Sequence, residues 1–220
     1  MLEALKEHDL KCSCYLAFIS APKATEEGNR KAVEMGKEAV EQTLRLGTKI
    51  MMFVPADYQD AVDTLAREAV AETFAEVLRP VVRYAEEKGV TVVIEDAPHR
   101  NFPMCSEAEL RYLLEAVPGL KLVYDSGNML HAGEDPVEYY DHLAEYTAHA
   151  HGKEVGRGPD GTLMECPHGE GMVDFKTLFS HMRENGFEGY IAIELAPNFS
   201  GEKRVQGRVQ DAMNYLTPLL

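Results

Sequence analysis

The sequence predicts an α/β protein in which parallel strands are covered by helices, and three observations support this fold class. Apolar runs typical of buried strands alternate along the chain with amphipathic segments typical of helices. Six strands and six helices follow one another in this way, which favours parallel strands joined by helical crossovers. The chain has 220 residues, of which 45% are hydrophobic, so we expect one domain over residues 1–220 with a sizeable core.

Each element is predicted from its own residues. Strands are expected at 10–20, 48–55, 90–96, 120–125, 147–151 and 190–196. Helices are expected at 26–47, 60–88, 106–117, 135–146, 173–186 and 205–220. Gly47 stands where the first of these helices must end, and Pro136 stands in the first turn of the fourth. Pro80 lies inside the second helix, where it removes a backbone donor, so we expect a kink there.

Two architectures fit this alternation, a (β/α)8 TIM barrel and an open doubly wound sheet. The glycine patterns GxGxxG and GxxxxGK[ST], which bind nucleotides in open sheets, are absent from the sequence. The barrel makes the sharper prediction, because its functional residues lie at the C-terminal ends of the strands.

Four successive apolar strands end in a residue that can bind a metal ion. These residues are Glu95, Asp125, His151 and Glu194. A carboxylate buried at a strand end is costly unless something compensates its charge, and one divalent cation would compensate all of these groups together. An oxygen-rich set with a single nitrogen favours Mn²⁺, Mg²⁺ or Co²⁺, with Zn²⁺ also possible. His149 competes with His151 as the nitrogen ligand, but His151 lies nearer the end of its strand, so we expect His149 to pack behind it.

Composition limits the partners and the compartment. The formal charge is −15, with 37 acidic and 22 basic residues, which disfavours nucleic acid and anionic membranes as partners. No apolar run reaches the ~18 residues that a membrane span needs. The cysteines at 12, 14, 105 and 166 form no CxxC pair, and we expect them to be reduced. These observations together favour a cytoplasmic protein.

Five stretches resemble one known family. They are VVIED, LVYDSGNMLHAGEDP, AHAHGKEVGRG, HGEGMVDF and GYIAIE, in that order. With them the sequence resembles the xylose isomerase-like TIM-barrel superfamily, in particular its sugar isomerase/epimerase branch. The resemblance implies a TIM barrel whose metal ligands are Glu95, Asp125, His151 and Glu194. It also implies that Glu95 and Glu194 exchange protons with the substrate.

The resemblance further implies a set of side chains that contact the substrate. These are Asn128, Arg157, Lys153 and His99. Arg157 stands six residues beyond His151, the spacing at which the epimerases place an arginine on substrate oxygens. For Lys153 and Glu154 a second interpretation stays open, a solvated salt-bridge pair. Asn128 replaces a histidine of many members, and Asn101 replaces a glutamate of many epimerases, which argues against strict ketose 3-epimerase activity.

We therefore predict a divalent-metal-dependent sugar isomerase or epimerase that removes a proton next to a carbonyl group. Two alternatives remain: a metal-dependent sugar or polyol dehydratase of the same superfamily, and a degenerate, non-catalytic sugar- or metal-binding protein. A DNA-repair endonuclease of the superfamily is disfavoured, because it needs more histidines and a basic face. The expected partner is a small sugar or polyol.

The chain departs from the family at its start. Family members begin with a strand, a helix and a second strand before a segment like LEALKEHDLKC, and this chain lacks those elements. We expect an incomplete barrel of six parallel strands, with open edges near 12–19 and 190–195. A truncated gene product, closure by a second subunit and a degenerate binding protein would each explain it, and we favour a homo-oligomer that covers the gap.

Overall fold

The computed structural model describes residues 2–20, 25–56, 66–97, 104–195 and 202–220. Its strands are β1 (Tyr15–Ser20), β2 (Ile50–Ala56), β3 (Thr91–Glu95), β4 (Lys121–Asp125), β5 (Thr147–Gly152), β6 (Val155–Arg157), β7 (Leu163–Glu165) and β8 (Ile191–Ile193). Its α-helices are α1 (Leu2–Glu7), α2 (Glu26–Arg45), α4 (Arg67–Glu87), α5 (Glu107–Ala116), α6 (Pro136–Leu143), α7 (Phe175–Glu184) and α8 (Glu202–Leu216). Three short 3-10 helices are η1 (Asn128–His131), η2 (Ala144–Tyr146) and η3 (Thr217–Leu219).

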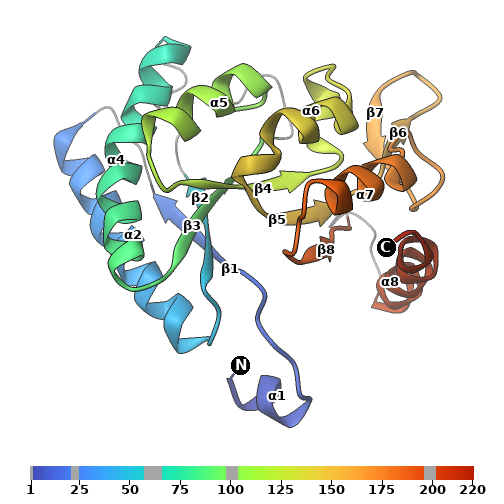
Figure 1. Ribbon diagram of the computed structural model, residues 1–220, viewed down its shortest axis with the longest axis horizontal. Helices are drawn as coiled ribbons and strands as arrows, with labels where there is room; N and C mark the ends of the chain where they lie inside the picture. The colour runs from blue at the N-terminus through green and yellow to red at the C-terminus, as the bar shows by residue number, and fades with distance from the viewer. Residues whose placement is uncertain (1, 21–24, 57–65, 98–103, 196–201) are drawn as a thin grey trace. The chain divides into compact units, whose positions relative to one another are not determined.

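In the described residues, six strands form one hydrogen-bonded sheet in the order β1-β2-β3-β4-β5-β8 (Figure 1). The pairs β1–β2, β2–β3, β3–β4 and β5–β8 are parallel. This confirms the predicted α/β class with six strands in the main sheet. The chain divides into two units: unit 1 contains Met1–Glu95 and Ala108–Val123, and unit 2 contains Asp96–Glu107 and Tyr124–Leu220. No helix within the described ranges is long and apolar enough to cross a membrane.

Unit 1 is built around β1, β2 and β3, with α2 and α4 packed side by side against these strands (Figure 1). The apolar residues of both helices recur at helical spacing, so each helix turns one face to the sheet. The two helices meet at Gly36, which is buried. A β-carbon added there would lie 2.6 Å from Cγ2 of Val81 and 3.0 Å from its Cγ1, so the close approach of α2 and α4 depends on this glycine.

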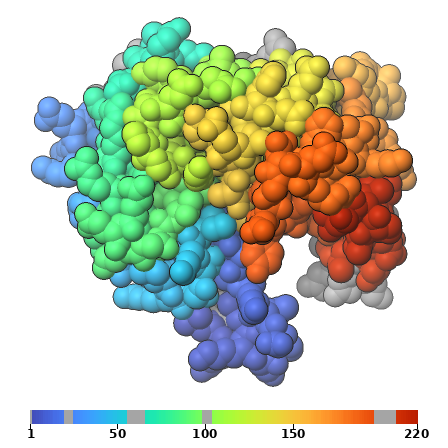
Figure 2. All heavy atoms as spheres, viewed as in Figure 1, coloured from blue at the N-terminus to red at the C-terminus, as the bar shows by residue number. Residues whose placement is uncertain are grey.

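Unit 2 carries β5, β8 and the helices α6, α7 and α8. In the space-filling view α6, α7 and α8 form neighbouring parts of one surface (Figure 2). Asp135 caps α6, because its carboxylate accepts the backbone N–H groups of Val137 and Glu138. The hydroxyl of Tyr124 is fully buried and donates to the carbonyl of Pro136 at 2.8 Å, which ties β4 to the first turn of α6.

Several boundaries differ from those predicted. The first strand begins at Tyr15 rather than at residue 10, and its pairing with β2 begins with Tyr15 opposite Met51. Cys12 and Cys14, which fall inside the predicted strand range 10–20, therefore precede the strand. The last strand ends at Ile193, so Glu194 follows it directly. The helix expected at 60–88 is α4, which continues through Pro80, and residues 57–65 lie outside the described residues.

The segment after β5 contains an element that the sequence did not reveal. Strands β6 and β7 form an antiparallel hairpin, with Arg157 opposite Leu163. Each strand is only three residues long and the connection is rich in Gly and Pro, so neither strand shows an alternating apolar pattern.

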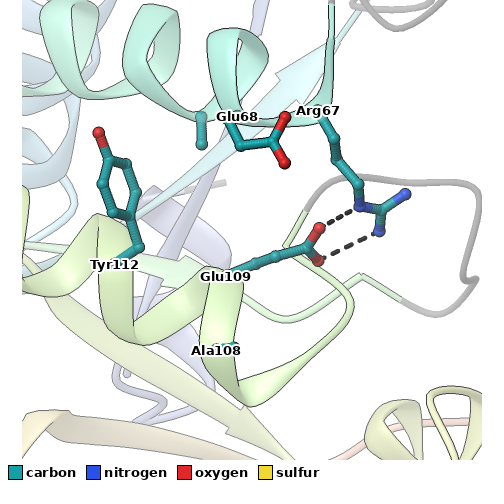
Figure 3. Close-up of a pocket in the computed structure, with 6 residues that line it drawn as sticks. Arg67, Glu68, Ala108, Glu109 and Tyr112 are labelled. Atoms are coloured by element: carbon teal, nitrogen blue, oxygen red, sulfur yellow. Dashed lines mark hydrogen bonds and ion pairs between the residues drawn. The ribbon is translucent and has the colours of Figure 1, made fainter.

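Unit 1 also has a surface pocket of about 280 Å³ between the first turns of α4 and α5 (Figure 3). The guanidinium group of Arg67 pairs with the carboxylate of Glu109 beside it. No residue predicted from the sequence to act in the site lines this pocket within the described part of the chain.

The contact at Gly36 can be tested by overpacking. We expect Gly36→Val to lower the free energy of unfolding by about 1–3 kcal/mol, because the new side chain must displace Val81. Val81→Ala in the same protein should restore part of this loss, so the double variant should lose less than the sum of the single variants. Urea unfolding followed by circular dichroism measures each value. Lys31→Val, at an exposed position of α2, controls for helix propensity; equal losses at both positions would contradict the close contact.

Candidate metal centre

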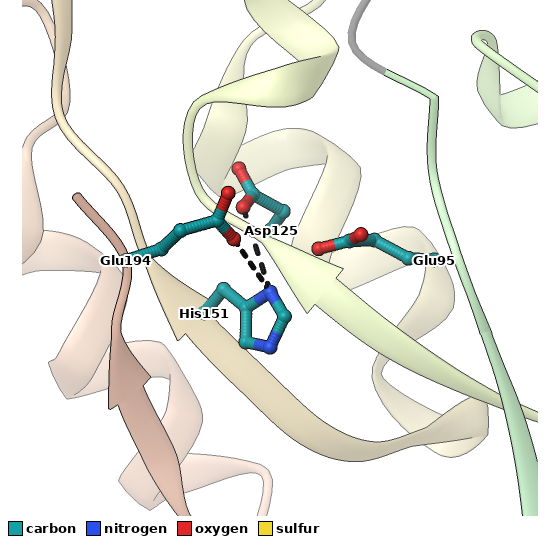
Figure 4. A group of neighbouring side chains, drawn as sticks. All are labelled: Glu95, Asp125, His151 and Glu194. Atoms are coloured by element: carbon teal, nitrogen blue, oxygen red, sulfur yellow. Dashed lines mark ion pairs between the residues drawn. The ribbon is translucent and has the colours of Figure 1, made fainter. Parts of the chain in front are cut away.

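Four of the predicted residues come together. One ligand-type atom from each of Glu95, Asp125, His151 and Glu194 lies within 4.8 Å of the others, and the side chains point toward one another (Figure 4). Glu95 ends β3, Asp125 ends β4 and His151 lies near the end of β5, while Glu194 follows β8. The carboxyl ends of these strands thus bring together residues that are far apart in the sequence.

Asp125 divides its two carboxylate oxygens between two tasks. Its Oδ1 accepts the backbone N–H groups of Gly127 and Asn128 at 2.8 and 2.9 Å, which folds the DSGN segment into a tight turn. Its Oδ2 lies 3.1 Å from Nζ of Lys153 and 3.8 Å from Nδ1 of His151. The side chain is fully buried. Oδ2 is therefore the oxygen that faces the other charged groups.

Glu194 contacts two nitrogen atoms, one with each oxygen. Its Oε2 lies 2.8 Å from Nδ1 of His151, and its Oε1 lies 2.6 Å from Nζ of Lys153. Burial raises the pKa of the Glu194 carboxyl, but the hydrogen bond from His151 and the positive charge of Lys153 outweigh burial and lower this pKa to about 2. Glu194 is therefore ionised at neutral pH.

Lys153 is placed between the carboxylates by the backbone around it. The hydroxyl of Ser126 donates to the carbonyl of Lys153 at 2.8 Å and accepts the Lys153 backbone N–H at 2.9 Å. The backbone N–H of Ser126 also donates to the carbonyl of His151 at 3.1 Å. A β-carbon at Gly127 would lie 3.0 Å from Cγ of Lys153 and 2.8 Å from Cγ2 of Val155, so a glycine leaves room for the lysine stem.

Asn128 connects this turn to the segment after β3. Its side-chain N–H group donates to the backbone carbonyl of Asp96 at 2.9 Å, and its Oδ1 accepts from Nζ of Lys153 at 3.0 Å. The carboxylate of Asp96 in turn accepts the backbone N–H of Asp125 at 3.2 Å. Both ends of the Asn128 amide are therefore engaged by the protein.

The other predicted residues lie as follows. Arg157 is exposed on the β6–β7 hairpin, where its guanidinium donates to the carbonyl of Gly161 at 3.2 Å. His99 lies outside the described residues. His149 packs edge-on against the ring of His151, with 5.6 Å between ring centroids. Burial, together with electrostatic repulsion from His151, lowers the pKa of His149 to about 4. This position agrees with a packing role for His149.

The interpretation of Lys153 and Glu154 as a solvated salt-bridge pair is wrong. Both side chains are buried. The carboxylate of Glu154 instead accepts the backbone N–H groups of Gly169 and Val173, which holds the loop before α7. Because successive residues of an extended segment point in opposite directions, Lys153 turns toward Asp125 while Glu154 turns toward that loop.

The donor set fits a divalent cation. Metal–oxygen bonds of about 2.1 Å place ligand atoms roughly 3–4.5 Å apart around one ion, close to the separations in this cluster. Ser126, Gly127 and Asp96 support the candidate ligands but were not predicted from the sequence. The signal was present for all three, since Asp96 follows the candidate ligand Glu95 and the other two follow Asp125 in the turn.

The carboxyl ends of the parallel strands carry three carboxylates and an imidazole, a combination of side chains that can bind a metal ion. The fold and the site therefore define an α/β protein with a candidate metal centre. Residues 1–218 match the family described as Xylose isomerase-like TIM barrel, and the chain belongs to this family. The resemblance predicted from the sequence is thereby confirmed.

Relatives of known activity match part of the chain. An inosose dehydratase of Lacticaseibacillus casei is 23% identical in an alignment 125 positions long, which covers 50% of this chain and 42% of the relative. A fructoselysine 3-epimerase of Escherichia coli O157:H7 is 26% identical over 137 residues, which are 61% of this chain and 49% of the relative. The matches thus span less than half the length of these relatives. The crystal structure of an IOLI protein with a binding zinc atom shares the fold, with a TM-score of 0.79, 20% identity, and coverage of 100% of this chain and 82% of that one.

The role of Ser126 can be tested by stability. We expect Ser126→Ala to lower the free energy of unfolding by about 1–3 kcal/mol, because both buried backbone groups of Lys153 lose their partner. Chemical unfolding of the metal-free protein measures the change. Ser180→Ala removes an exposed hydroxyl in the same unit and should change the stability by less than about 0.5 kcal/mol. A Ser126→Ala variant as stable as the control would show that this hydroxyl does not stabilise the contact between the turn and Lys153.

Proposed function

We propose that this protein is a divalent-metal-dependent enzyme that removes a proton from a carbon next to the carbonyl group of a small sugar or oxidised polyol. The observation that carries the proposal is the convergence of Asp125, His151 and Glu194, together with Glu95, on one small volume. A divalent cation bound there would polarise the carbonyl and hydroxyl oxygens of a substrate and stabilise the charge of an enediolate. The oxygen-rich ligand set supports Mn²⁺, Mg²⁺ or Co²⁺, and the zinc named for the IOLI protein supports Zn²⁺ as well.

Burial divides the roles of the carboxylates. The side chain of Asp125 is 0% exposed, so it can hold a metal but cannot reach a substrate carbon. The side chain of Glu194 is 35% exposed and can do both. We assign Glu194 and Glu95 as the pair that removes and returns protons, each acting as base or acid at the substrate carbon.

The shared first step leads to more than one product. An enediolate that is reprotonated gives an epimer or an isomer, whereas one that expels a neighbouring hydroxide gives a dehydrated product. The relatives include both an epimerase and a dehydratase, and the two outcomes are supported equally. A binding protein without catalysis is the remaining alternative.

The remaining polar residues have supporting roles in this proposal. Asn128 acts through Lys153, because both ends of its amide bond to the protein. Arg157 and His99 are proposed to contact substrate oxygens, as the family resemblance implies.

Proton abstraction can be read directly by deuterium exchange. In D₂O we expect the Mn²⁺-loaded protein to exchange a carbon-bound proton of its substrate from a panel of ketoses and inososes, observed by ¹H NMR. Glu194→Gln should reduce the exchange rate at least 100-fold while circular dichroism stays unchanged. Glu188→Gln, at an exposed position before β8, should leave the rate unchanged. Metal binding without exchange on any substrate would favour the non-catalytic alternative, and new vinyl or enol signals would identify dehydration.

We also propose that a second copy of the chain covers the free edge of β1. β1 is the first strand in the sheet order, and in the described residues it pairs only with β2. Leu16 and Phe18 on this strand are 42% and 67% exposed, and an exposed apolar edge strand favours association.

Association can be tested at this edge. We expect the protein to be a dimer or larger at micromolar concentration in light scattering coupled to gel filtration. Phe18→Glu should shift it toward the monomer, because a charge would be buried in the interface. Met164→Glu, which changes an exposed residue on β7, should not shift it. A wild-type protein that is monomeric throughout would overturn the proposal.

A further inference from the structure

The ammonium group of Lys153 lies close to three oxygen atoms inside the candidate metal centre. Its Nζ lies 2.6 Å from Oε1 of Glu194, 3.0 Å from Oδ1 of Asn128 and 3.1 Å from Oδ2 of Asp125. The side chain is only 7% exposed. One of these contacts, to Oδ1 of Asn128, is a hydrogen bond, and the contacts to the two carboxylates are ion pairs. The Lys153 ammonium is therefore a buried part of the site and not a surface charge that happens to lie nearby.

One of these acceptors is an atom that a metal ion would need. Oδ1 of Asp125 is already occupied by two backbone N–H groups, so Oδ2 is the oxygen left for a cation. The ammonium of Lys153 forms an ion pair with that same Oδ2 at 3.1 Å. The lysine and a divalent cation therefore compete for one carboxylate oxygen.

Charge makes the competition stronger. A divalent cation beside Asp125, His151 and Glu194 would lie within a few ångströms of the ammonium in a largely buried site, where repulsion between like charges is poorly screened. Without a cation, the ammonium offsets the negative charge of Asp125 and Glu194. The same group thus stabilises the metal-free site and opposes the binding of a metal.

If the ammonium of Lys153 moved away from Asp125, it would keep an acceptor in Asn128. Asn128 offers Oδ1 as an acceptor, and its amide is fixed through Asp96. The lysine stem lies close to Gly127 and its backbone is fixed by Ser126, which limits the move to the end of the side chain.

We propose that Lys153 is a tethered counter-cation of the metal centre, which replaces the charge of the metal in the metal-free protein and weakens metal binding by holding Oδ2 of Asp125. This inference rests on the proposed metal-dependent function, but it concerns metal affinity and not the reaction. It differs from a substrate contact, which would leave metal affinity unchanged, and from a packing role, whose loss would disorder the ligands and weaken metal binding.

The test measures Mn²⁺ alone, without any substrate. Protein stripped with a chelator is titrated with Mn²⁺, and free Mn²⁺ is followed by electron paramagnetic resonance and binding heat by calorimetry. We expect Lys153→Met, which keeps the stem and removes the charge, to bind Mn²⁺ roughly tenfold more tightly or better. Lys153→Arg keeps the charge and should stay near the wild-type affinity. Lys176→Met removes an exposed lysine of α7 and should have no effect beyond about twofold.

Thermal unfolding gives a second readout in the same proteins. Metal-free Lys153→Met should unfold several degrees below the wild type, because Asp125 and Glu194 lose their buried partner. Saturating Mn²⁺ should raise its unfolding temperature by more than it raises that of the wild type. If metal-free Lys153→Met does not fold, Lys153→Gln, whose neutral amide can still donate to a carboxylate, is measured instead, and tighter binding than wild type is again expected.

The outcomes separate the inference from the proposed function. Tighter Mn²⁺ binding with a less stable metal-free state supports the role of Lys153. Equal or weaker Mn²⁺ binding by the neutral variants, with a wild type that binds, overturns this role and leaves the metal centre intact. If neither the wild type nor the neutral variants bind Mn²⁺, Mg²⁺, Co²⁺ or Zn²⁺ up to millimolar concentration, the proposed function itself fails.

Discussion

Negative charge gathered at the ends of parallel strands must be balanced, and this constraint governs the site. Asp125 is completely buried, and a buried carboxylate without compensation would disfavour the folded state. Two backbone N–H groups donate to one oxygen of this carboxylate, and the Lys153 ammonium forms an ion pair with the other. These contacts compensate the negative charge of Asp125. The carboxylate of Glu194 likewise contacts Nδ1 of His151 and Nζ of Lys153. The protein therefore holds several potential metal ligands together with a cation of its own, the Lys153 ammonium.

The geometry that achieves this balance comes from a few consecutive residues. The carboxylate of Asp125 folds the turn that follows it, and this turn places Ser126 against the backbone beyond β5. Gly127 leaves the space through which the Lys153 stem passes, and Asn128 receives the end of that stem. Four adjacent residues of the DSGN segment thus each perform a separate task. A substitution at any of them would change the position of the lysine as well as that of the turn.

The sequence predicted the candidate ligand set but not the contacts that balance the negative charge of its carboxylates. Strand ends are visible as the last polar residue of an apolar run, and the ends of parallel strands meet at one edge, so Glu95, Asp125, His151 and Glu194 could be expected together. The contacts of Lys153 could not be expected in this way, because they depend on the conformation of a long side chain after β5 has ended. The hairpin β6–β7, and with it the exposed position of Arg157, was hidden by strands too short for a pattern.

The difference in burial between Asp125 and Glu194 explains how residues of the same chemical kind can serve different purposes. Asp125 belongs to β4 and is enclosed on all sides, so its carboxylate is rigid and suited only to holding charge. Glu194 lies one residue beyond β8, where its backbone N–H still bonds to the carbonyl of Gly152 but its side chain reaches solvent. In the proposed function, a proton-transfer group needs both a fixed backbone and access to the substrate. The end of β8 at Ile193 gives Glu194 a fixed backbone and an accessible side chain, so the early termination of this strand suits the proposed role.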